Sequence, residues 1–360
     1  MKKITELNEK EFKKFEQNSK YGNFFQSVER AKLRRKMGFN TYLIGLKEKD
    51  NVSVAGLIVE RDGEAWIQIG PILDYNNTKL LNSFLDAIID YAKSKKFVKL
   101  EIFPPLVISI RDFDGSYVKK FNFDKVFETF KKHGFAHEGF TTKIENKANR
   151  WMFVKDLSDV KTFRDAELSM NASTRKKLHK TERELEIKVL KDKKDLPEWL
   201  TALQESDKRN GVHTRNVKYF EDLWDAFGEN AIFVEARRKD NGELVSSEVD
   251  IIHPNEMVAF VAGTIEKNKK HNGSIAIKGF NIEECLKRKI KRLNLYGMEG
   301  DFSPNNPLLY FKNGLGGYTE EYIGGFCIVL NKQKLLQNKI KRKIKSTFHI
   351  KNRLYKMLLL

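Results

Sequence analysis

One lysine stands apart from the others in this sequence. Lys312 follows Tyr310 and Phe311 in the stretch DFSPNNPLLYFKNGLGGYTEEYIGGF, which begins at Asp301, and a glycine-rich turn comes directly after it. Aromatic neighbours exclude water, and a cation in a partly dry site exerts a stronger field than one in bulk solvent. Such a cation can stabilise the oxyanion that forms when an amine attacks an ester. A surface lysine at a turn is the plainer interpretation, but the isolation of Lys312 among aromatic residues and glycines favours a functional role.

Separated arginines allow a second kind of chemistry, the binding of phosphate. Arg34 lies in the basic stretch VERAKLRRK, and Arg215 precedes Tyr219 by four residues. A guanidinium can grip a diphosphate through two parallel hydrogen bonds. The sequence equally allows both arginines to be solvated helix charges, and Tyr219 to be a core residue beside Phe220.

Metal and nucleotide motifs are weak in this sequence. His133 and His137 lie four apart with Gly134 between them and no third ligand nearby, so we expect no metal site. Neither Cys285 nor Cys327 lies in a nucleophile signature, and two cysteines fit a reducing cytosol. The stretches KKHNGSIAI and PILDYNNTK offer one glycine and none for a phosphate-binding loop, so we expect no cofactor, coenzyme A included.

Positive charge gathers at the end of the chain. Lys+Arg 67 against Asp+Glu 49 gives a net charge of +18, and residues 331–360 contain ten of these basic residues and no acidic one. A helix over this segment would carry an apolar face made by Leu336, Ile340, Ile344, Phe348, Leu354 and Leu358. Basic residues around an apolar face are typical of a helix that lies on anionic lipid, although a helix packed on the body or a frayed tail fits the same pattern. The amino terminus lacks a signal peptide's apolar core and no apolar run is long enough to span a membrane, so we expect a cytoplasmic protein, peripheral at the inner membrane face.

The elements that must position these residues follow one order twice. Helices come first, then a meander of three strands, a long helix and a further strand. In the first half the strands are TYLIGLKE, VSVAGLIVE and EAWIQIGPIL; in the second half they are AIFVEARRK, LVSSEVDII and MVAFVAGTI. We also predict one helix over AELSMNASTRKKLHKTERE. The chain of 360 residues is long for one domain, so we predict an α+β protein with two similar units.

With this order in place, the sequence resembles the FemABX peptidoglycan-bridge aminoacyltransferases over about residues 20–330. The resemblance rests on YGMEGDFSPNNPLLYFKNGLGGYTEEYIGGF, on NASTRKKLHK and on RNGVHTRNVKYFEDL. It implies two tandem acetyltransferase-like (GNAT-type) domains, which we place at residues 1–147 with 318–331 and at residues 148–317, before a basic amphipathic tail at 332–360. It also implies transfer of an amino acid from charged tRNA onto the stem peptide of a peptidoglycan precursor, either lipid II or a UDP-linked form. No feature of the sequence specifies an oligomeric state.

The resemblance assigns roles by position. Lys312 matches the family's motif lysine and Phe311 its aromatic residue, which implies that Lys312 steadies the charge that develops on the attacked ester. Arg215 and Tyr219 match an Arg-x-x-x-Tyr that contacts the acceptor's diphosphate and stem peptide. Arg34, eight residues after Gln26, matches a lysine that binds phosphate in the first domain. No general base is predicted.

Gly70-Pro71 match a Gly-Pro pair of the family, but two other features of the sequence depart from the family pattern. Phe103 stands where many members carry an aspartate, so a role for that carboxylate is not expected here. The stretch WDAFGENAIFVEARRK runs on without room for the coiled-coil hairpin that many members insert, which predicts a FemX-like short form. Two alternatives stay open: an acyl-CoA N-acyltransferase of the same fold, and a non-catalytic protein that binds nucleic acid or a membrane surface.

The basic tail gives a first testable prediction. Deletion of residues 331–360 is expected to lower binding to anionic vesicles at least about tenfold, because each basic residue near such a surface contributes roughly 1 kcal/mol. Transfer to a soluble precursor should be unchanged. Vesicle co-sedimentation of the full and shortened chains measures the effect, with neutral vesicles as the control, and unchanged binding to anionic vesicles would reject the interfacial helix.

Overall fold

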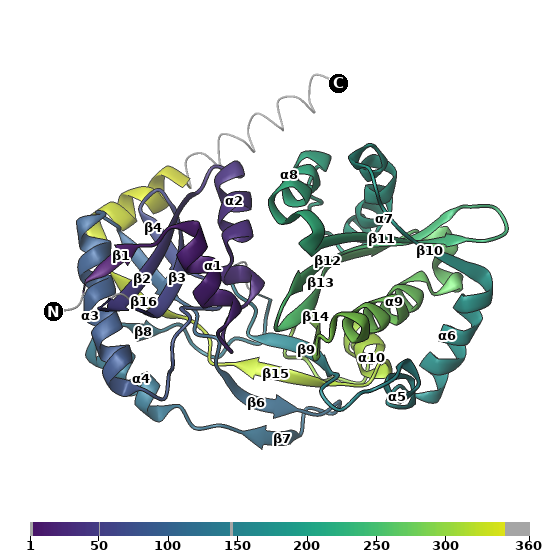
Figure 1. Ribbon diagram of the computed structural model, residues 1–360, viewed down its shortest axis with the longest axis horizontal. Helices are drawn as coiled ribbons and strands as arrows, with labels where there is room; N and C mark the ends of the chain where they lie inside the picture. Colours follow the sequence, from purple (N-terminus) through teal and green to yellow (C-terminus); the bar gives the residue numbers. More distant parts are fainter. Residues whose placement is uncertain (1–2, 50, 145–146, 343–360) are drawn as a thin grey trace.

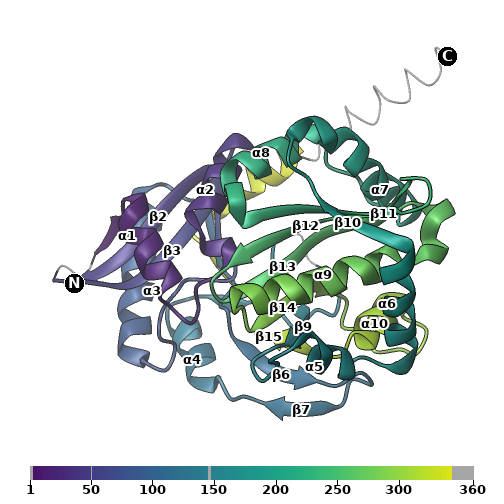
Figure 2. The same cartoon turned by 45° about the vertical axis from the view of Figure 1, so that its right-hand side comes forward.

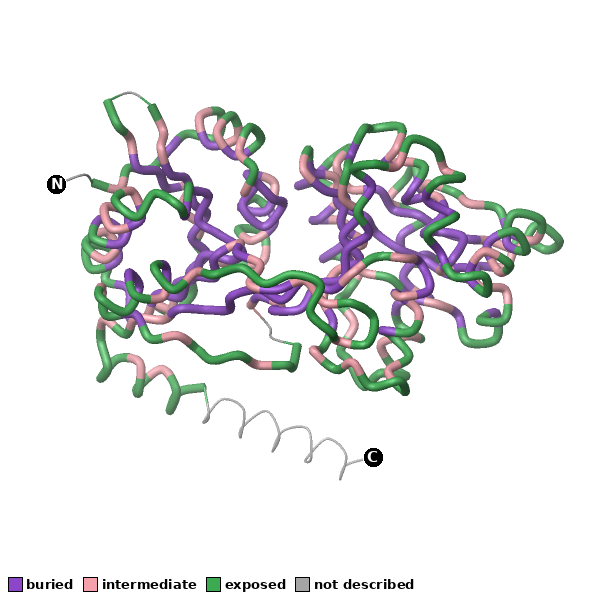
Figure 3. Tube along the Cα trace, turned by 90° about the horizontal axis from the view of Figure 1, so that it is seen from below, coloured by how far each residue is buried: buried purple, intermediate pink, exposed green. Residues whose placement is uncertain are grey.

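The chain forms two α+β units that lie side by side (Figure 1). We describe residues 3–49, 51–144 and 147–342 of a computed structural model. The predicted α+β fold with two sheets is confirmed. Figure 3 shows the buried segments concentrated inside each unit and the exposed segments on the outside.

The first unit is built on one mixed sheet. Within the described residues it has seven strands, in the order β1 (Ile4–Glu6), β2 (Asn40–Glu48), β3 (Asn51–Arg61), β4 (Glu64–Ile67), β5 (Lys99–Ile102), β16 (Phe326–Val329) and β8 (Ala136–His137). All neighbours pair antiparallel except β4 and β5, which are parallel. The covering helices are α1 (Glu9–Gln17), α2 (Val28–Lys36), α3 (Thr78–Ser94) and α4 (Asp124–Lys132).

The second unit has the larger sheet. Its strands, counted over the described residues, are nine: β10 (Leu185–Val189), β11 (Ala231–Arg238), β12 (Leu244–His253), β13 (Glu256–Thr264), β14 (Arg292–Met298), β9 (Trp151–Asp156), β15 (Tyr318–Tyr322), β6 (Val107–Arg111) and β7 (Tyr117–Lys120). Its helices are α5 (Phe163–Leu168), α6 (Ala172–Glu184), α7 (Leu196–Arg209), α8 (Val217–Phe227), α9 (Gly273–Arg288) and α10 (Pro307–Gly314). Figure 2 shows α9 lying across the face of the sheet that contains β13 and β14.

The single helix predicted over residues 166–184 is wrong. The chain breaks at Ser169–Asn171 into α5 and α6, because the Asn171 side chain accepts a hydrogen bond from the Thr174 amide and so begins a new helix. Asparagine is a preferred helix cap, since its short side chain competes with the backbone for amide protons.

Some strands that we assigned to the first domain from the sequence lie in the second sheet. Strand β15, placed with the first domain from sequence, pairs with β9 and β6 in the second sheet, and β6 and β7 lie there too. Strand β16 does return to the first sheet, where it pairs with β5. The boundaries at residues 1–147 with 318–331 and at 148–317 therefore stay a prediction, and the units are more interwoven than those limits suggest.

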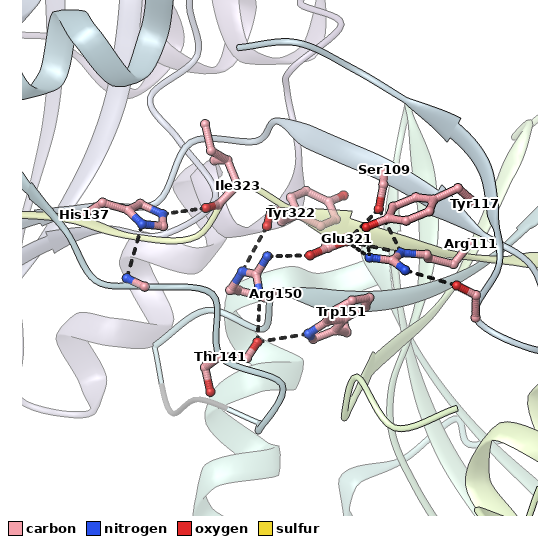
Figure 4. A network of polar contacts seen from close by, with 12 residues as sticks. Ser109, Arg111, Tyr117, His137, Thr141, Arg150, Trp151, Glu321, Tyr322 and Ile323 are labelled. Carbon is pink, nitrogen blue, oxygen red and sulfur yellow. Dashed lines mark hydrogen bonds and ion pairs between the residues drawn. The ribbon is translucent and has the colours of Figure 1, made fainter. Parts of the chain in front are cut away.

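A network of charged side chains connects β15 with its neighbours in the second sheet (Figure 4). The Glu321 carboxylate on β15 accepts hydrogen bonds from Ser109 at 2.6 Å, from Arg111 at 2.8 Å and from Arg150 at 2.9 Å. Arg150 also donates to the backbone carbonyl of Thr141 at 2.8 Å. Because the carboxylate and the Arg150 guanidinium are both buried and both paired, this network ties β6, β9 and β15 together.

The interface between the units includes aromatic contacts and a buried polar pair. Phe24 of the first unit packs against Phe260 and Phe227 of the second, with ring centroids 5.5 and 6.4 Å apart. His253 at the end of β12 contacts the Glu16 carboxylate of α1, and both side chains are buried. Desolvation raises the pKa of Glu16, against the opposing effect of His253.

The start of the basic tail lies on the outside of the first unit. Residues 332–342 are helical, the Asn338 side chain donates to the Asp62 carbonyl at 2.8 Å, and Arg342 lies 3.0 Å from Glu64. Leu336 and Ile340 are exposed. Ile344, Phe348, Leu354 and Leu358, the rest of the predicted apolar face, lie outside the described residues. In the part of the chain described here, no helix has the length and apolar character needed to cross a membrane.

The pair between Glu16 and His253 generates a stability prediction. Glu16→Ala is expected to lower the free energy of unfolding by about 3 kcal/mol, because it leaves a buried partner without its hydrogen bond. Glu9→Ala is the matched control on the same helix: Glu9 pairs with Lys32 and Arg35 at the surface, so its loss should cost less than about 1 kcal/mol. Urea unfolding of both variants measures the difference, and equal losses would contradict a special role for the buried pair.

Candidate active site

Lys312 is carried by a short helix with a well-defined start. The Asn306 side chain accepts hydrogen bonds from the amides of Leu308 and Leu309, both at 3.1 Å, and Pro307 occupies the first turn of α10. Proline suits this position because its missing N–H would have no partner there. After the helix, Gly316 has a φ of +74°, and a Cβ there would lie 2.3 Å from the Ser169 carbonyl oxygen. The glycines after Lys312 thus allow a tight turn against α5.

The Lys312 side chain is buried and held by backbone. It is 4% exposed, and its Nζ donates to the carbonyl oxygens of Tyr296 and Gly297, both at 3.1 Å. Both carbonyls belong to β14 at the place where its register against β9 shifts, between Asn294 and Gly297. Tyr296 has a φ of +65° at this bulge, which is unusual for a residue with a side chain. Two of the three ammonium protons are therefore engaged, and one is left for a ligand.

Burial makes the Lys312 amine titrate near neutrality. Desolvation, with a smaller contribution from the charge of Lys278, lowers the pKa of Lys312 to about 7. A negative charge that forms beside this amine would favour its protonated state. An anion that forms beside Lys312 and the protonated Lys312 amine would therefore stabilise each other.

A pocket of about 340 Å³ opens beside Lys312, between β13 and β14. These parallel strands pair only where Met257 and Val258 meet Leu293 and Asn294, and beyond that point they separate. Apolar and polar groups share the wall: Ala259, Phe260, Leu295, Leu308 and Phe311 on one hand, and Ser206, Glu248, Thr264, Ser274 and Lys278 on the other. The volume is in the range of small-ligand sites.

The second lysine of the pocket is already neutralised. Lys278 forms a buried ion pair with Glu248, and Asn281 donates to Glu248 at 2.7 Å and to Asp250 at 3.0 Å. Desolvation and the neighbouring Glu248 raise the pKa of Asp250 well above its usual range. Among the described residues no acidic group lies within ion-pair distance of Lys312, so its charge is the one available to a ligand in this pocket.

Lys155 shows what a purely structural buried lysine looks like here. Its Nζ donates to Leu315 O at 2.7 Å, to Ser169 Oγ at 2.5 Å and to Ala166 O at 3.2 Å, so its protons are fully used. Burial lowers its pKa to about 8. Lys155 joins the ends of α5 and α10, whereas Lys312 faces a pocket with a proton to spare.

A second site lies where α2 and α8 face one another across the junction of the units (Figure 1). Helix α2 is anchored at its start by Gln26, whose side chain donates to Gln68 O at 2.6 Å and accepts from the Leu57 amide at 2.7 Å. The Ser27 hydroxyl then caps α2 through the Arg30 amide. At the other end, Lys36 pairs with Asp222 and Asp225 of α8 at 3.3 and 3.1 Å.

This junction brings Arg34 close to Arg215 and Tyr219, which lie far from it in the sequence. The Arg215 guanidinium lies 4.7 Å from the centroid of the Tyr219 ring, and Tyr219 is buried among apolar residues. Burial, and then the charge of Arg30, lowers the pKa of Arg34 to about 9, and Tyr219 and Arg215 also influence it. Their assigned roles stay predictions, but their proximity makes a cationic site. We call Arg30, Arg34, Arg215, Tyr219 and Tyr296 the arginine cluster.

Arg30 and Tyr296 belong to this cluster and were missed from the sequence. Arg30 is 5% exposed, and neither it nor Arg34 has an acidic partner among the residues described. Tyr296 joins the two sites, because Arg30, Arg34 and Arg215 influence the pKa of its hydroxyl while its carbonyl accepts from Lys312. The i, i+4 spacing of Arg30 and Arg34 on α2 was the available signal.

The remaining predicted residues have plain positions. Phe311 lines the Lys312 pocket, and Phe103 is buried with its carbonyl accepting from the Gly70 amide at 2.8 Å. The EEYIG motif is structural: Glu320 accepts from Arg292 at 2.5 Å, and Glu321 belongs to the network of Figure 4. His133 and His137 do not form a cluster, and the described ranges contain no group of histidine, cysteine or acidic side chains arranged to hold a metal.

Fold and site together define the class. The molecule is a protein of two α+β units with a buried lysine beside the split between two parallel strands. The sequence model described as "FemAB family" matches residues 7–239 and 234–341. The chain belongs to the FemAB family, and the family predicted from the sequence is confirmed.

Individual relatives agree with this assignment. The chain is 24% identical to the aminoacyltransferase FemB of Staphylococcus epidermidis, over 94% of this chain and 100% of that protein. It is 23% identical to the aminoacyltransferase FemA of Staphylococcus aureus, over 92% of this chain and 96% of that protein. The crystal structure of FemX superimposes with a TM-score of 0.80 at 16% identity, over 93% of this chain and 99% of FemX.

The alignment with FemB also bears on chain length. It runs over 420 residues but includes 94% of this 360-residue chain, which is about 340, so about 80 positions exist in FemB alone. In this chain α8 ends at Phe227 and β11 begins at Ala231, with a single 3-10 turn between them. Both observations support the predicted short form.

The contrast between the two buried lysines can be tested by stability. Lys155→Met is expected to lower the free energy of unfolding by about 2–3 kcal/mol, because it removes the buried hydrogen bonds to Leu315 O, Ser169 Oγ and Ala166 O. Lys312→Met should change it by less than about 1 kcal/mol, because the two carbonyls that it frees adjoin a pocket that admits water. Thermal or urea unfolding at pH 7 measures both. A large loss for Lys312→Met would make that lysine a structural residue like Lys155.

Proposed function

We propose that this chain is an aminoacyltransferase that moves an amino acid from aminoacyl-tRNA onto an amine of the stem peptide of a peptidoglycan precursor, and so builds the interpeptide bridge. Membership of the FemAB family and the names of its aminoacyltransferase relatives support this. The single observation that carries the proposal is the buried Lys312 ammonium, with one free proton beside a pocket between parted strands.

In this proposal the ester end of the donor enters the Lys312 pocket. The acceptor amine attacks the ester carbonyl carbon, a C–N bond forms, and the carbonyl oxygen becomes an oxyanion. The free N–H of Lys312 donates to that oxygen, which stabilises the tetrahedral state. The C–O bond to the ribose then breaks, and the proton lost by the amine is taken up by the departing oxygen. No covalent enzyme intermediate and no metal or organic cofactor enters these steps.

Arg34 and Arg215 of the arginine cluster would hold the acceptor's diphosphate. Arg34 and Arg215 approach the junction from different units, Arg34 from α2 and Arg215 just before α8. Guanidinium groups bind phosphate oxygens in pairs, so two of them suit two phosphates. Tyr296 connects the cluster to Lys312 through its backbone carbonyl. One acceptor molecule could therefore have its diphosphate at the cluster and its amine at the pocket.

We further propose peripheral contact with anionic lipid at the inner membrane face. The helix at residues 332–342 begins this contact: Leu336 and Ile340 are exposed, and it is tied to the first unit through Asp62. Arg61 lies beside Asp62 in the chain, and its guanidinium stacks on Phe39 at 3.6 Å, with Arg34 on the same ring at 5.3 Å. The helix thus adjoins the region that would bind a lipid-linked diphosphate.

The deciding experiment supplies the chain with a pool of charged tRNA and either lipid II or the UDP-linked precursor, and weighs the product. The expected result is a mass gain equal to one or more amino acid residues. Acetyl-CoA in place of charged tRNA should give no product. A gain with acetyl-CoA and none with charged tRNA would replace the proposal by an acyl-CoA transferase.

The pKa of Lys312 adds a prediction on pH. Deprotonation of the acceptor amine makes kcat/KM rise with pH, and loss of the Lys312 ammonium above about pH 7 cancels that rise, so the curve should bend to a plateau there. Lys312→Met is expected to lower the rate about 100- to 1,000-fold. Lys312→Arg keeps a cation at all pH values, so it should retain about 1% of the rate or more and lose the bend. An arginine variant as inactive as the methionine variant would indicate that Lys312 acts as a base.

A further inference from the structure

Unpaired hydrogen-bond donors gather between α2 and β4. Arg30 Nε, Arg34 Nε and Trp66 Nε1 are buried and, among the described residues, have no acceptor. We call these three groups the donor row; Arg30 Nη2 lies 3.4 Å from Gln68 Oε1, and Gln68 follows Trp66 by two residues in the chain. The Phe39 ring lies 5.3 Å from the Arg34 guanidinium and 5.6 Å from Trp66. A row of donors without acceptors indicates an anionic ligand.

Arg30 is the most buried cation of this row. It is 5% exposed, its single side-chain partner is the long contact to Gln68, and its guanidinium lies 5.8 and 5.7 Å from the Phe24 and Phe25 rings. A buried charge without a counter-charge is costly, and proteins keep one where a ligand supplies the opposite charge. Elsewhere a buried arginine such as Arg150 is paired with a carboxylate.

The position of Arg30 lies between the two sites already described. On one side Arg34 is one helical turn away. On the other side Tyr296 stacks on Phe25 with ring centroids 6.2 Å apart, and the Tyr296 carbonyl accepts from Lys312. An acceptor that reaches from the diphosphate to the reacting amine would therefore pass Arg30.

We propose that Arg30 binds a carboxylate that the acceptor carries between its diphosphate and its reacting amine, and that the protein thereby selects acceptors with a free carboxylate over those with a carboxamide. The inference rests on the proposed function. Arg34 and Arg215 account for two phosphates, so a third guanidinium calls for a third anion. A planar fork of N–H donors matches a carboxylate, and a neutral amide would leave the buried charge uncompensated.

The test compares two acceptors that differ only in carboxylate or carboxamide at that position. The unaltered chain should show a kcat/KM about 30-fold or more higher for the carboxylate. Arg30→Gln should lower kcat/KM for the carboxylate about 30- to 100-fold, mainly through KM, and change it less than about threefold for the carboxamide. Arg34→Gln should weaken both acceptors equally, because both carry the diphosphate.

Arg35→Gln is the matched control. Arg35 lies on the same helix, but it is exposed and pairs with Glu9 at 3.2 Å, so its loss should leave both acceptors unchanged. Unfolding curves show whether Arg30→Gln is folded. If it is not, Arg30→Lys, which keeps the charge without the fork, should show an intermediate preference.

The outcomes distinguish failure of the carboxylate site at Arg30 from failure of the proposed aminoacyltransferase function. An unaltered chain without preference, or an Arg30→Gln variant that loses the same factor on both acceptors, would overturn the carboxylate site. If the unaltered chain transfers nothing to either acceptor, the proposed function fails, and calorimetric titration of the two acceptors into the protein then tests Arg30 on binding alone. A folded Arg30→Gln variant that binds both acceptors as the unaltered chain does would reject the site.

Discussion

The hydrogen bonds from the Lys312 ammonium to two carbonyls of the β14 bulge are the interaction on which the site depends. Tyr296 and Gly297 lie at this bulge, and Lys312, a buried residue of the partly exposed helix α10, donates to both of their carbonyls. The amine is thus fixed with one proton free, in a setting that lowers its pKa to about 7. The local irregularity of β14, including the positive φ of Tyr296, is therefore part of the site and not a defect of the sheet.

Charge compensation separates structural from functional cations in this protein. Lys155, Lys278, Arg150 and Arg292 are buried or partly buried, and each has carbonyl or carboxylate partners that use its protons. Lys312, Arg30 and Arg34 keep donors without partners among the described residues. Since a buried cation without compensation costs stability, its presence points to a ligand with negative charge. One oxyanion at Lys312 and several anionic groups at the arginine cluster fit one reaction between an ester and a diphosphate-linked acceptor.

Contacts between the two units hold the Lys312 pocket and the arginine cluster in a fixed relative position. Aromatic contacts of Phe24, the buried pair of Glu16 with His253 and the shared strands β6 and β15 join the units at separate places. Tyr296 then links the arginine cluster to Lys312 within one residue, its ring toward the cluster and its carbonyl toward the amine. Transfer between two bound substrates needs such fixed placement, because proximity and orientation account for much of the rate.

The sequence by itself determined the elements with local signals and the residues with unusual neighbours. Alternating strands, capped helices, Lys312 among aromatic residues, and Arg34 and Arg215 in recognisable spacings could all be predicted, because each depends on residues close in the chain. Only the tertiary structure decided that β6, β7 and β15 lie in the second sheet, that Asn171 splits a helix, and that Arg30 is buried without a counter-charge. Strand partners and the compensation of a charge depend on residues far apart in sequence, so no local pattern records them.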